Sequence, residues 1–234
     1  MDVNASISGA LKAGRDTLDE ETGKKVLASY GIKVPQSMLV TQPGGAADAF
    51  AKLHGPLVAK IVSPDIIHKS DIGGVKVGIG SAEELEGALR EIEAAAKAHT
   101  DNIEGYLVEE MVPAGHEVVV GGSTDRTFGP IVMFGLGGIF VEVLADVAFR
   151  ICPITPIDAQ EMIEELKTVK LLRGARGGIR ASEESIVDTL MKVGGEEGMM
   201  LSLEGKVTEI DVNPLIVSET EAVAVDARFV LKRD

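Results

Sequence analysis

Three side chains that carry hard oxygen ligands lie near the end of the chain: Asp211, Asn213 and Asp226. The segment 207–228 is typical of two strands joined by a tight turn, and strand side chains alternate between faces. If the turn centres on residues 219–220, the antiparallel register sets Asn213 opposite Asp226, with Asp211 on the same face. A carboxylate and an amide oxygen side by side suit the magnesium ion of a bound nucleotide. The alternative is a solvated face on an ordinary hairpin.

A second group of polar side chains lies in and after the apolar strand LVAKIV. Lys60 inside this strand could face a phosphate, although a lysine in such a position usually extends outward at a sheet edge. In the following loop His68 stands beside a lysine, whose positive charge disfavours imidazolium and so favours a neutral, nucleophilic histidine. Gly73 and Gly74 then free the backbone to approach a ligand. A single histidine is more often structural or simply exposed, so His68 alone does not indicate catalysis.

Two glycine-rich segments could bind anions through their backbone amides. FGLGGIFVE at 134–142 could form an amide nest, but its spacing fits neither the dinucleotide-binding fingerprint nor the phosphate-binding loop. RGARGG at 173–178 places Arg173 and Arg176 among glycines. That pattern is equally typical of a flexible surface loop and of an anion or partner contact, so neither segment assigns a function alone.

Alternating strands and helices must position these residues, and they predict an α/β (α+β) fold. The expected helices are 17–31, with a capping box at Thr17, then 46–53, 81–98, a helix opened by Thr155 and Pro156, and 182–199. The expected strands are 37–40, 57–62, 75–79, 105–112, 117–122, 130–135, 139–144 and the closing hairpin. A boundary near residue 105 divides the chain into an extension 1–16, a first subdomain 17–105 and a second subdomain 106–234. The two subdomains are expected to share an interface, and such interfaces favour ligands.

Composition restricts the compartment and the partners. The formal net charge of -14 over 234 residues argues against binding to nucleic acid and to anionic membranes. A single cysteine, Cys152, excludes an internal disulfide, and its apolar neighbours predict a small core residue. No segment reaches the ~18 consecutive apolar residues of a membrane span. The first residues do not resemble a signal peptide, so we expect a soluble, cytoplasmic protein.

Taken in order, these segments resemble the β subunit of ADP-forming acetyl-CoA synthetase (acetate–CoA ligase). This family is related to succinyl-CoA synthetase within the NDP-forming acyl-CoA synthetase superfamily. The most specific portions are KIVSPDIIHKSDIGGVKVGI, VEEMVPAGHEVVVGGSTDRTFGPIVMFGLGGIFVEVLADVAFR, LLRGARG and EIDVNP. The resemblance runs from about Thr17 to Leu231. It implies an ATP-grasp fold, in which two α/β subdomains hold the nucleotide between them.

The resemblance also implies a set of nucleotide-binding positions. They are Lys60, Gly73, Gly74, Glu109, Glu110, Met111, Val112 and Glu117. Lys60 and the two glycines would lie near the phosphates, the hinge 109–112 would meet adenine through its backbone, and Glu117 would lie on the nucleotide side. Asn213 and Asp226 fall where the family holds magnesium, and Asp211 falls where an acidic side chain meets a phosphohistidine. These two sets would form the site for ADP or ATP.

The implied reaction is acyl-CoA + ADP + phosphate ⇌ carboxylic acid + CoA + ATP, with acetate as the default acid. A separate α subunit would bind CoA and carry the phosphohistidine, and this chain would pass the phosphoryl group to ADP as the β subunit of an α2β2 assembly. His68 matches the position of a relay histidine in the acetyl-CoA branch. Two alternatives stay open: another ATP-grasp carboxylate ligase, and a non-catalytic nucleotide-binding regulatory subunit.

Overall fold

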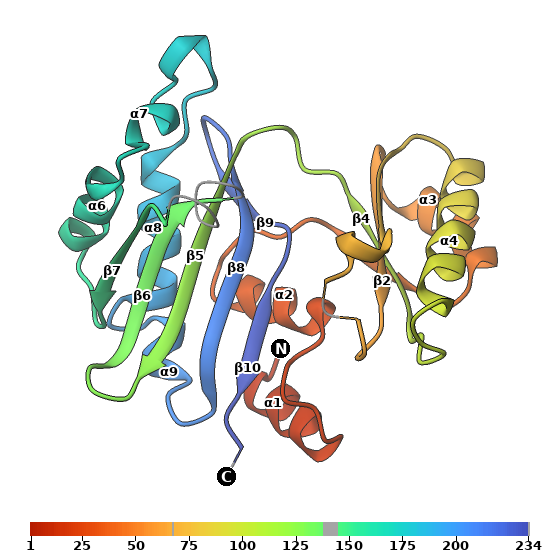
Figure 1. Ribbon diagram of the computed structural model, residues 1–234, viewed down its shortest axis with the longest axis horizontal. Helices are drawn as coiled ribbons and strands as arrows, with labels where there is room; N and C mark the ends of the chain where they lie inside the picture. Colours follow the sequence, from red (N-terminus) through yellow and green to blue (C-terminus); the bar gives the residue numbers. More distant parts are fainter. Residues whose placement is uncertain (67, 138–144, 234) are drawn as a thin grey trace. The chain divides into compact units, whose positions relative to one another are not determined.

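The chain is divided into two compact units in the computed structural model, which describes residues 1–66, 68–137 and 145–233 (Figure 1). The smaller unit is Pro35–Val112, and the larger unit combines Met1–Val34 with Pro113–Asp234. This differs from the expected subdomains 17–105 and 106–234 and from the expected extension 1–16. The first 34 residues belong with the later part of the chain because their helices pack into its core.

The smaller unit is an antiparallel sheet covered by helices. Its strands are β1 (Ser37–Val40), β2 (Leu57–Val62), β3 (Val75–Ile79) and β4 (Gly105–Glu110), in the order β1-β4-β2-β3. Its helices are α3 (Ala46–Lys52), α4 (Ala82–Lys97) and the short 3₁₀ turns η1 (Pro43–Gly45) and η2 (Ser70–Ile72). Leu57 and Ile61 of β2 are buried in one core with Leu89 of α4. The predicted Ser81 cap is confirmed, since Ser81 Oγ accepts a hydrogen bond from the Glu84 N–H at 3.1 Å.

The larger unit is built on a six-stranded antiparallel sheet. Its strands are β5 (His116–Asp125), β6 (Gly129–Leu136), β7 (Val147–Ile151), β8 (Val207–Val217), β9 (Ala222–Ala224) and β10 (Arg228–Leu231). They follow the order β10-β8-β5-β6-β7, with β9 paired to β8 beside β10. Its helices are α1 (Val3–Lys12), α2 (Glu20–Ser29), α6 (Pro156–Glu165), α7 (Val169–Leu172), η3 (Ala175–Gly177), α8 (Glu183–Gly194) and α9 (Met199–Ser202).

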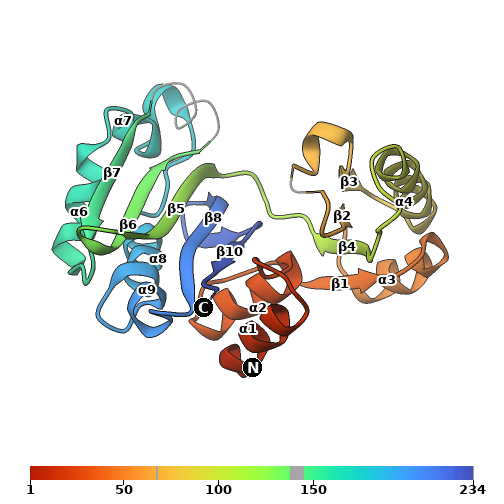
Figure 2. The same cartoon turned by 60° about the horizontal axis from the view of Figure 1, so that its bottom comes forward.

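Helices cover one face of this sheet. Figure 2 shows α8 and α9 on one side of β5 and β6, and both helices contact these two strands. Val120 of β5, Phe134 of β6 and Val212 of β8 are buried in the same core as Leu190 of α8. Since side chains alternate along each strand, the intervening residues form the opposite face of the sheet.

The first two helices explain why the chain divides as it does. Ile7 of α1 is buried in the core of the larger unit, and α2 contacts β10. The predicted cap of α2 is wrong, because Asp19 rather than Thr17 accepts the Thr22 N–H, at 2.8 Å, and the helix starts at Glu20. Thr17 instead forms an antiparallel bridge with Val230 of β10, the strand that α2 contacts.

Other local predictions have mixed outcomes. The Thr155 cap is confirmed as a full capping box with Asp158. The helix opened by Ser182 ends earlier than predicted, at Gly194, and α9 follows as a separate helix. Cys152 is buried as predicted, and burial raises the pKa of its thiol to about 11. The strand expected at 139–144 lies outside the described residues. In the part of the chain that the structure describes, no helix is both long and apolar enough to cross a membrane.

Candidate functional site

The closing hairpin has the register predicted from its turn. Val217 pairs with Ala222, and the Ser218 N–H donates to the Glu221 carbonyl at 2.9 Å. The same register reappears farther along, where Asp211 pairs with Arg228. Asn213 and Asp226 therefore occupy facing positions between the β8–β9 and β8–β10 pairings.

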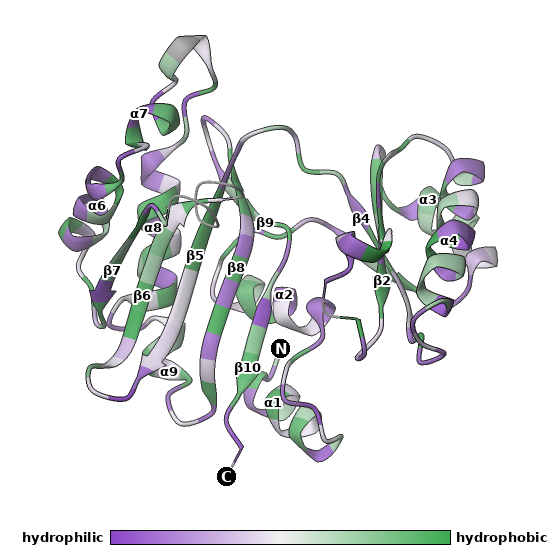
Figure 3. Cartoon of the chain, viewed as in Figure 1, coloured by the Kyte–Doolittle hydropathy of each residue, from purple (hydrophilic) through white to green (hydrophobic). Residues whose placement is uncertain are grey.

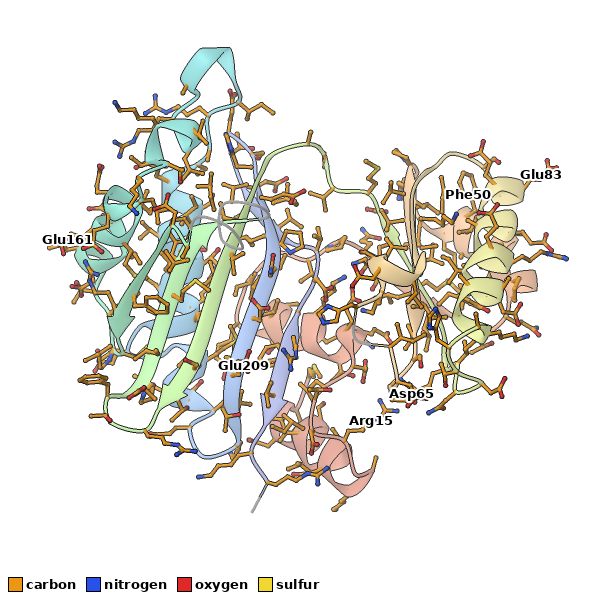
Figure 4. The ribbon with its side chains drawn as sticks, viewed as in Figure 1. Arg15, Phe50, Asp65, Glu83, Glu161 and Glu209 are labelled. Carbon is orange, nitrogen blue, oxygen red and sulfur yellow. The ribbon has the colours of Figure 1, made fainter. Side chains whose placement is uncertain are left out.

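Side chains on β8 alternate between the two faces from Glu209 to Asn213, and the pattern shifts at the irregularity before Leu215. Ile210 and Val212 are buried in the core, whereas Asp211 is half-buried and Asn213 is exposed on the opposite face. Figure 3 shows the resulting hydrophobic and hydrophilic bands along β8, and Figure 4 labels Glu209, which shares the polar face. The strand thus supports the core with one face and presents acidic and amide groups with the other.

The electrostatics of this face centre on Asp211. Burial raises the pKa of its carboxyl group above the ordinary value, and the negative charges of Glu209 and Asp226 raise it further, while Arg228 lowers it. Arg228 Nη1 lies 3.9 Å from Glu209 Oε1, so part of its charge is shared with that residue. Asp226 Oδ1 accepts the Ala227 N–H at 2.7 Å. Crowded carboxylates of this kind are stabilised by a nearby cation.

The donor set fits magnesium held together with a nucleotide. Among the described residues, no group of three or more His, Cys, Asp and Glu side chains is arranged to hold a metal ion by itself. Asn213 and Asp226 offer an amide oxygen and a carboxylate at facing positions. Mg²⁺ is usually bound by one or two such side chains, with phosphate and water oxygens completing its shell.

Lys60 is buried, contrary to the outward orientation usual for a lysine in an apolar strand. Strand β2 lies between β4 and β3, and Lys60 Nζ lies 2.9 Å from Glu109 Oε2 of β4. Sequence reasoning missed this ion pair, because it depends on which strands are neighbours. Lys76 on β3 is more exposed, and its Nζ lies 2.5 Å from Glu91 Oε2.

The loop after β2 brings His68 to the surface of the smaller unit. Local backbone conformation and packing explain the two glycines of this loop. Gly73 has a φ of +74°, and a Cβ on Gly74 would lie 2.7 Å from Ile61 Cγ2 and 2.8 Å from the Lys69 carbonyl oxygen. The positive φ of Gly73 and the close approaches at Gly74 explain both glycines without a ligand, so their contact with phosphate stays a prediction.

The segment after β4 is tied to the turn before β2 by one backbone N–H group and one side chain. The Met111 N–H donates to the Pro56 carbonyl at 2.9 Å, and the Glu110 carboxylate accepts the N–H of His54 at 2.9 Å. No hydrogen bond within the described chain involves the Met111 carbonyl or the Val112 N–H. An adenine ring needs one acceptor and one donor of this kind at neighbouring positions.

In the larger unit, Glu117 is exposed near the start of β5. Its carbonyl oxygen accepts the Gly137 N–H at 2.7 Å, and a Cβ on Gly137 would lie 3.0 Å from that oxygen. Part of the expected amide nest is therefore used to close β6 onto β5, and Gly138 lies outside the described residues. The neighbouring His116 Nε2 lies 2.6 Å from the Ile179 carbonyl, next to the arginine- and glycine-rich loop.

Asp146 is a buried anchor that sequence reasoning also missed. Its carboxylate accepts the N–H groups of Lys167 and Thr168 at 3.0 and 2.9 Å, and the Thr168 hydroxyl as well. Burial opposes its ionisation, but these hydrogen bonds outweigh burial, so the pKa of Asp146 is lowered. The signal in the sequence was an aspartate directly before the strand β7. A buried aspartate must find hydrogen-bond donors.

Comparison with known proteins shows which family the chain belongs to. The model of the ATP-grasp domain matches residues 9–231. The β subunit of acetate–CoA ligase (ADP-forming) I of Pyrococcus furiosus is 45% identical over 223 residues, which cover 94% of each chain. The chain belongs to this ATP-grasp family.

Other relatives agree in sequence and structure. Acetate–CoA ligase (ADP-forming) I of Archaeoglobus fulgidus is 42% identical over 96% of this chain, which spans only 32% of that longer protein. Acetyl-coenzyme A synthetase 1 of Ca. Korarchaeum cryptofilum, in complex with coenzyme A and Ca-AMPCP, has a TM-score of 0.93 at 40% identity, covering 99% of this chain and 100% of that chain. A further structure of the Korarchaeum enzyme contains Mg-AMPPCP, with its phosphohistidine segment pointing towards the nucleotide binding site.

These comparisons confirm the family resemblance, the ATP-grasp fold class and the ligase class expected from the sequence. The fold is a nucleotide-binding one, and the name of the Pyrococcus relative marks it as one subunit of a larger enzyme. The roles of individual residues are a separate matter, and they stay predictions.

Proposed function

We propose that this chain is the nucleotide-binding β subunit of an ADP-forming acyl-CoA synthetase that makes ATP from acyl-CoA, ADP and phosphate. The observation that carries this proposal is the acidic face of β8, where Asn213 and Asp226 occupy facing positions beside Asp211. The similarity to a β subunit along 94% of both chains supports it. Acetate is the default acid, taken from the names of the relatives.

Several segments of the chain would supply residues that bind the nucleotide. Lys60 would neutralise phosphate charge, with Glu109 holding its ammonium group in position, and Gly73 and Gly74 would lie nearby. The Met111 carbonyl and the Val112 N–H would meet adenine, Glu110 would support this segment through His54, and Glu117 would approach the ribose. Asn213 and Asp226 would hold Mg²⁺, which supplies charge neutralisation at the phosphates.

The chemical step would be phosphoryl transfer from a histidine of a separate α subunit to ADP. The N–P bond of the phosphohistidine breaks as its phosphorus bonds to a ring nitrogen of His68, and this second N–P bond breaks in turn as the phosphorus bonds to a β-phosphate oxygen of ADP. In each step the imidazole nitrogen keeps the electron pair of the broken bond. Asp211 would accept a hydrogen bond from the other ring N–H of the phosphohistidine, which orients its imidazole. The partner would supply CoA binding, in an α2β2 assembly.

His68 is proposed as a relay for the phosphoryl group. Its side chain is exposed in a loop, which a residue that receives and passes on a phosphoryl group requires. In the complex with the α subunit, His68→Ala should abolish turnover while Mg²⁺-dependent ADP binding is retained, with His99→Ala as the control. Unchanged turnover in the His68 variant would remove this residue from the mechanism.

A turnover assay tests the proposed function directly. The chain would be co-expressed with its α subunit, and ATP formation would be followed with ADP, phosphate and a panel of acyl-CoAs. We expect ATP and free CoA in equal amounts, with no ATP formed by either subunit alone. Absence of ATP formation with every acyl-CoA tested, despite a stable complex, would exclude this function.

A further inference from the structure

The face of the six-stranded sheet that the helices leave uncovered carries large apolar side chains at one edge. Phe149 and Ile151 of β7 are each 54% exposed, and Ile131 and Met133 of the adjacent β6 are half-buried. Arg150 points to the other face, where its guanidinium pairs with Glu165 of α6. We call Ile131, Met133, Phe149 and Ile151 the apolar strip.

The apolar strip continues directly into the acidic face of β8. Strand pairing places Phe149, Met133, Gly121 and Asp211 in one row across four neighbouring strands. Adjacent strands are ~4.8 Å apart, so Phe149 and Asp211 are separated by about 14 Å. Gly121 has no side chain to interrupt this row, and Met133 Cε lies 3.2 Å from where its Cβ would be. The apolar strip and Asp211 therefore form one surface.

The position of this surface indicates which ligand it meets. Glu117, proposed to lie near the ribose, precedes Gly121 by four residues on the same face of β5, a distance of about 13 Å along the strand. The purine end of the nucleotide is therefore remote from the apolar strip. Beside Asp211, by contrast, the proposed function brings a histidine of the partner subunit.

We propose that the apolar strip is the surface on which the phosphohistidine-bearing segment of the α subunit docks. Apolar residues flanking that histidine would cover Phe149 and Met133, while its ring N–H would meet the carboxylate of Asp211. The acidic half of the surface complements a hydrogen-bond donor, and the apolar half supplies contact area. This inference rests on the proposed function and adds where the partner segment binds.

The test measures transfer and nucleotide binding separately in the purified complex of both subunits. Single-turnover transfer from [γ-³²P]ATP to the histidine of the α subunit would be compared in the wild-type complex and the Phe149→Ser complex. We expect a loss of about tenfold or more in the transfer rate, with the Kd for Mg-ADP unchanged, because a central aromatic contact of the docked segment is removed. Phe149→Leu should restore most of the rate.

Ile157→Ser provides the matched control. Ile157 is 67% exposed in α6, which packs against β6 and β7 on the other face of the sheet, so transfer should be unchanged. An equal transfer rate in the Phe149→Ser complex would overturn the docking surface, and so would a matching loss of Mg-ADP affinity. A wild-type complex that transfers no phosphoryl group would instead refute the proposed function.

A photo-crosslinking amino acid in place of Phe149 identifies the occupant. In the complex of both subunits, the crosslinked peptide of the α subunit should contain the phosphorylated histidine. A crosslink to a second copy of this chain, or to a distant part of the α subunit, would overturn the proposal.

Discussion

At the scale of single residues, the acidic face of β8 lowers the stability of the folded protein when no cation is bound. Asp211 is half-buried beside Glu209 and Asp226, and burial together with these charges raises the pKa of its carboxyl group. Repulsion of this kind is typical of sites that bind cationic or proton-donating ligands. The cluster therefore makes more physical sense as a binding site than as a stabilising feature.

Asp226→Ala tests the metal role at this face. The variant loses one of the two proposed oxygen ligands, so the Kd for ADP in the presence of Mg²⁺ should rise by about tenfold or more, as removal of one charge-assisted contact predicts. Calorimetric titration with ADP, in Mg²⁺ and in EDTA, measures this. Binding in EDTA should hardly change. Glu204→Ala, which removes an exposed carboxylate before β8, is the control, and equal Mg²⁺-dependent affinity in both variants would contradict the assignment.

Asp211→Asn should change the dependence of stability on pH. An acid whose pKa is raised in the folded state contributes stability below its ordinary pKa and loses it as the pH rises through the folded-state value. The uncharged amide should therefore increase the Tm at pH 7, with a gain that shrinks as the pH falls towards 4, measured by thermal unfolding without nucleotide. Asp125→Asn should have the opposite sign, because N–H groups of Phe128 and Thr127 lower the pKa of Asp125. A Tm gain at Asp211 that does not vary with pH would contradict this explanation.

At the scale of elements, the loop between β2 and β3 depends on close packing of the backbone. Gly74 lies against Ile61 and the Lys69 carbonyl oxygen, and the Gly74 carbonyl accepts the Ile61 N–H at 2.8 Å. This contact joins the loop that carries His68 to the strand that carries Lys60. Two residues of the proposed site are thus positioned by one glycine.

Gly74→Ala should destabilise the protein by about 1–3 kcal/mol, the usual effect of overpacking. Gly87→Ala in α4 is the matched control, since its Cβ would meet no atom within 4 Å, and alanine there should stabilise the helix by about 0.5–1 kcal/mol. Urea denaturation of both variants measures the two effects. A Gly74 variant as stable as the wild type would show that the loop can move away from Ile61.

Elements set by local interactions could be predicted from the sequence, and those set by distant contacts could not. The Ser81 and Thr155 caps and the register of the closing hairpin follow from hydrogen bonds and alternation within a few residues. The Lys60–Glu109 pair and the anchoring of Asp146 require knowledge of neighbouring strands and loops. The place of α2 in the larger unit depends on its contact with β10, about 200 residues later in the chain.

At the scale of the whole molecule, the smaller unit is inserted into the larger one. Its two ends lie together, because Ser37 of β1 pairs with Glu109 of β4 and the Glu110 N–H donates to the Gln36 carbonyl at 3.0 Å. Its core is separate from that of the larger unit and is centred on fully buried residues such as Leu85, Leu89 and Ile92. An inserted segment with neighbouring ends and its own core has the features of an independent folding unit.

We therefore expect the fragment 35–112 to fold alone, with a cooperative thermal transition followed by circular dichroism and dispersed amide resonances in its NMR spectrum. Leu89→Ala in this fragment should cost about 2–5 kcal/mol, enough to remove the transition from so small a domain, because it opens a cavity in a limited core. Leu39→Ala, at a position 39% exposed on β1, should leave the transition nearly unchanged. A fragment without cooperative unfolding would mean that the smaller unit depends on the rest of the chain for its stability. A smaller unit that folds alone also keeps its own structure when a residue of the larger unit, such as Asp226, is replaced, because the two cores are separate.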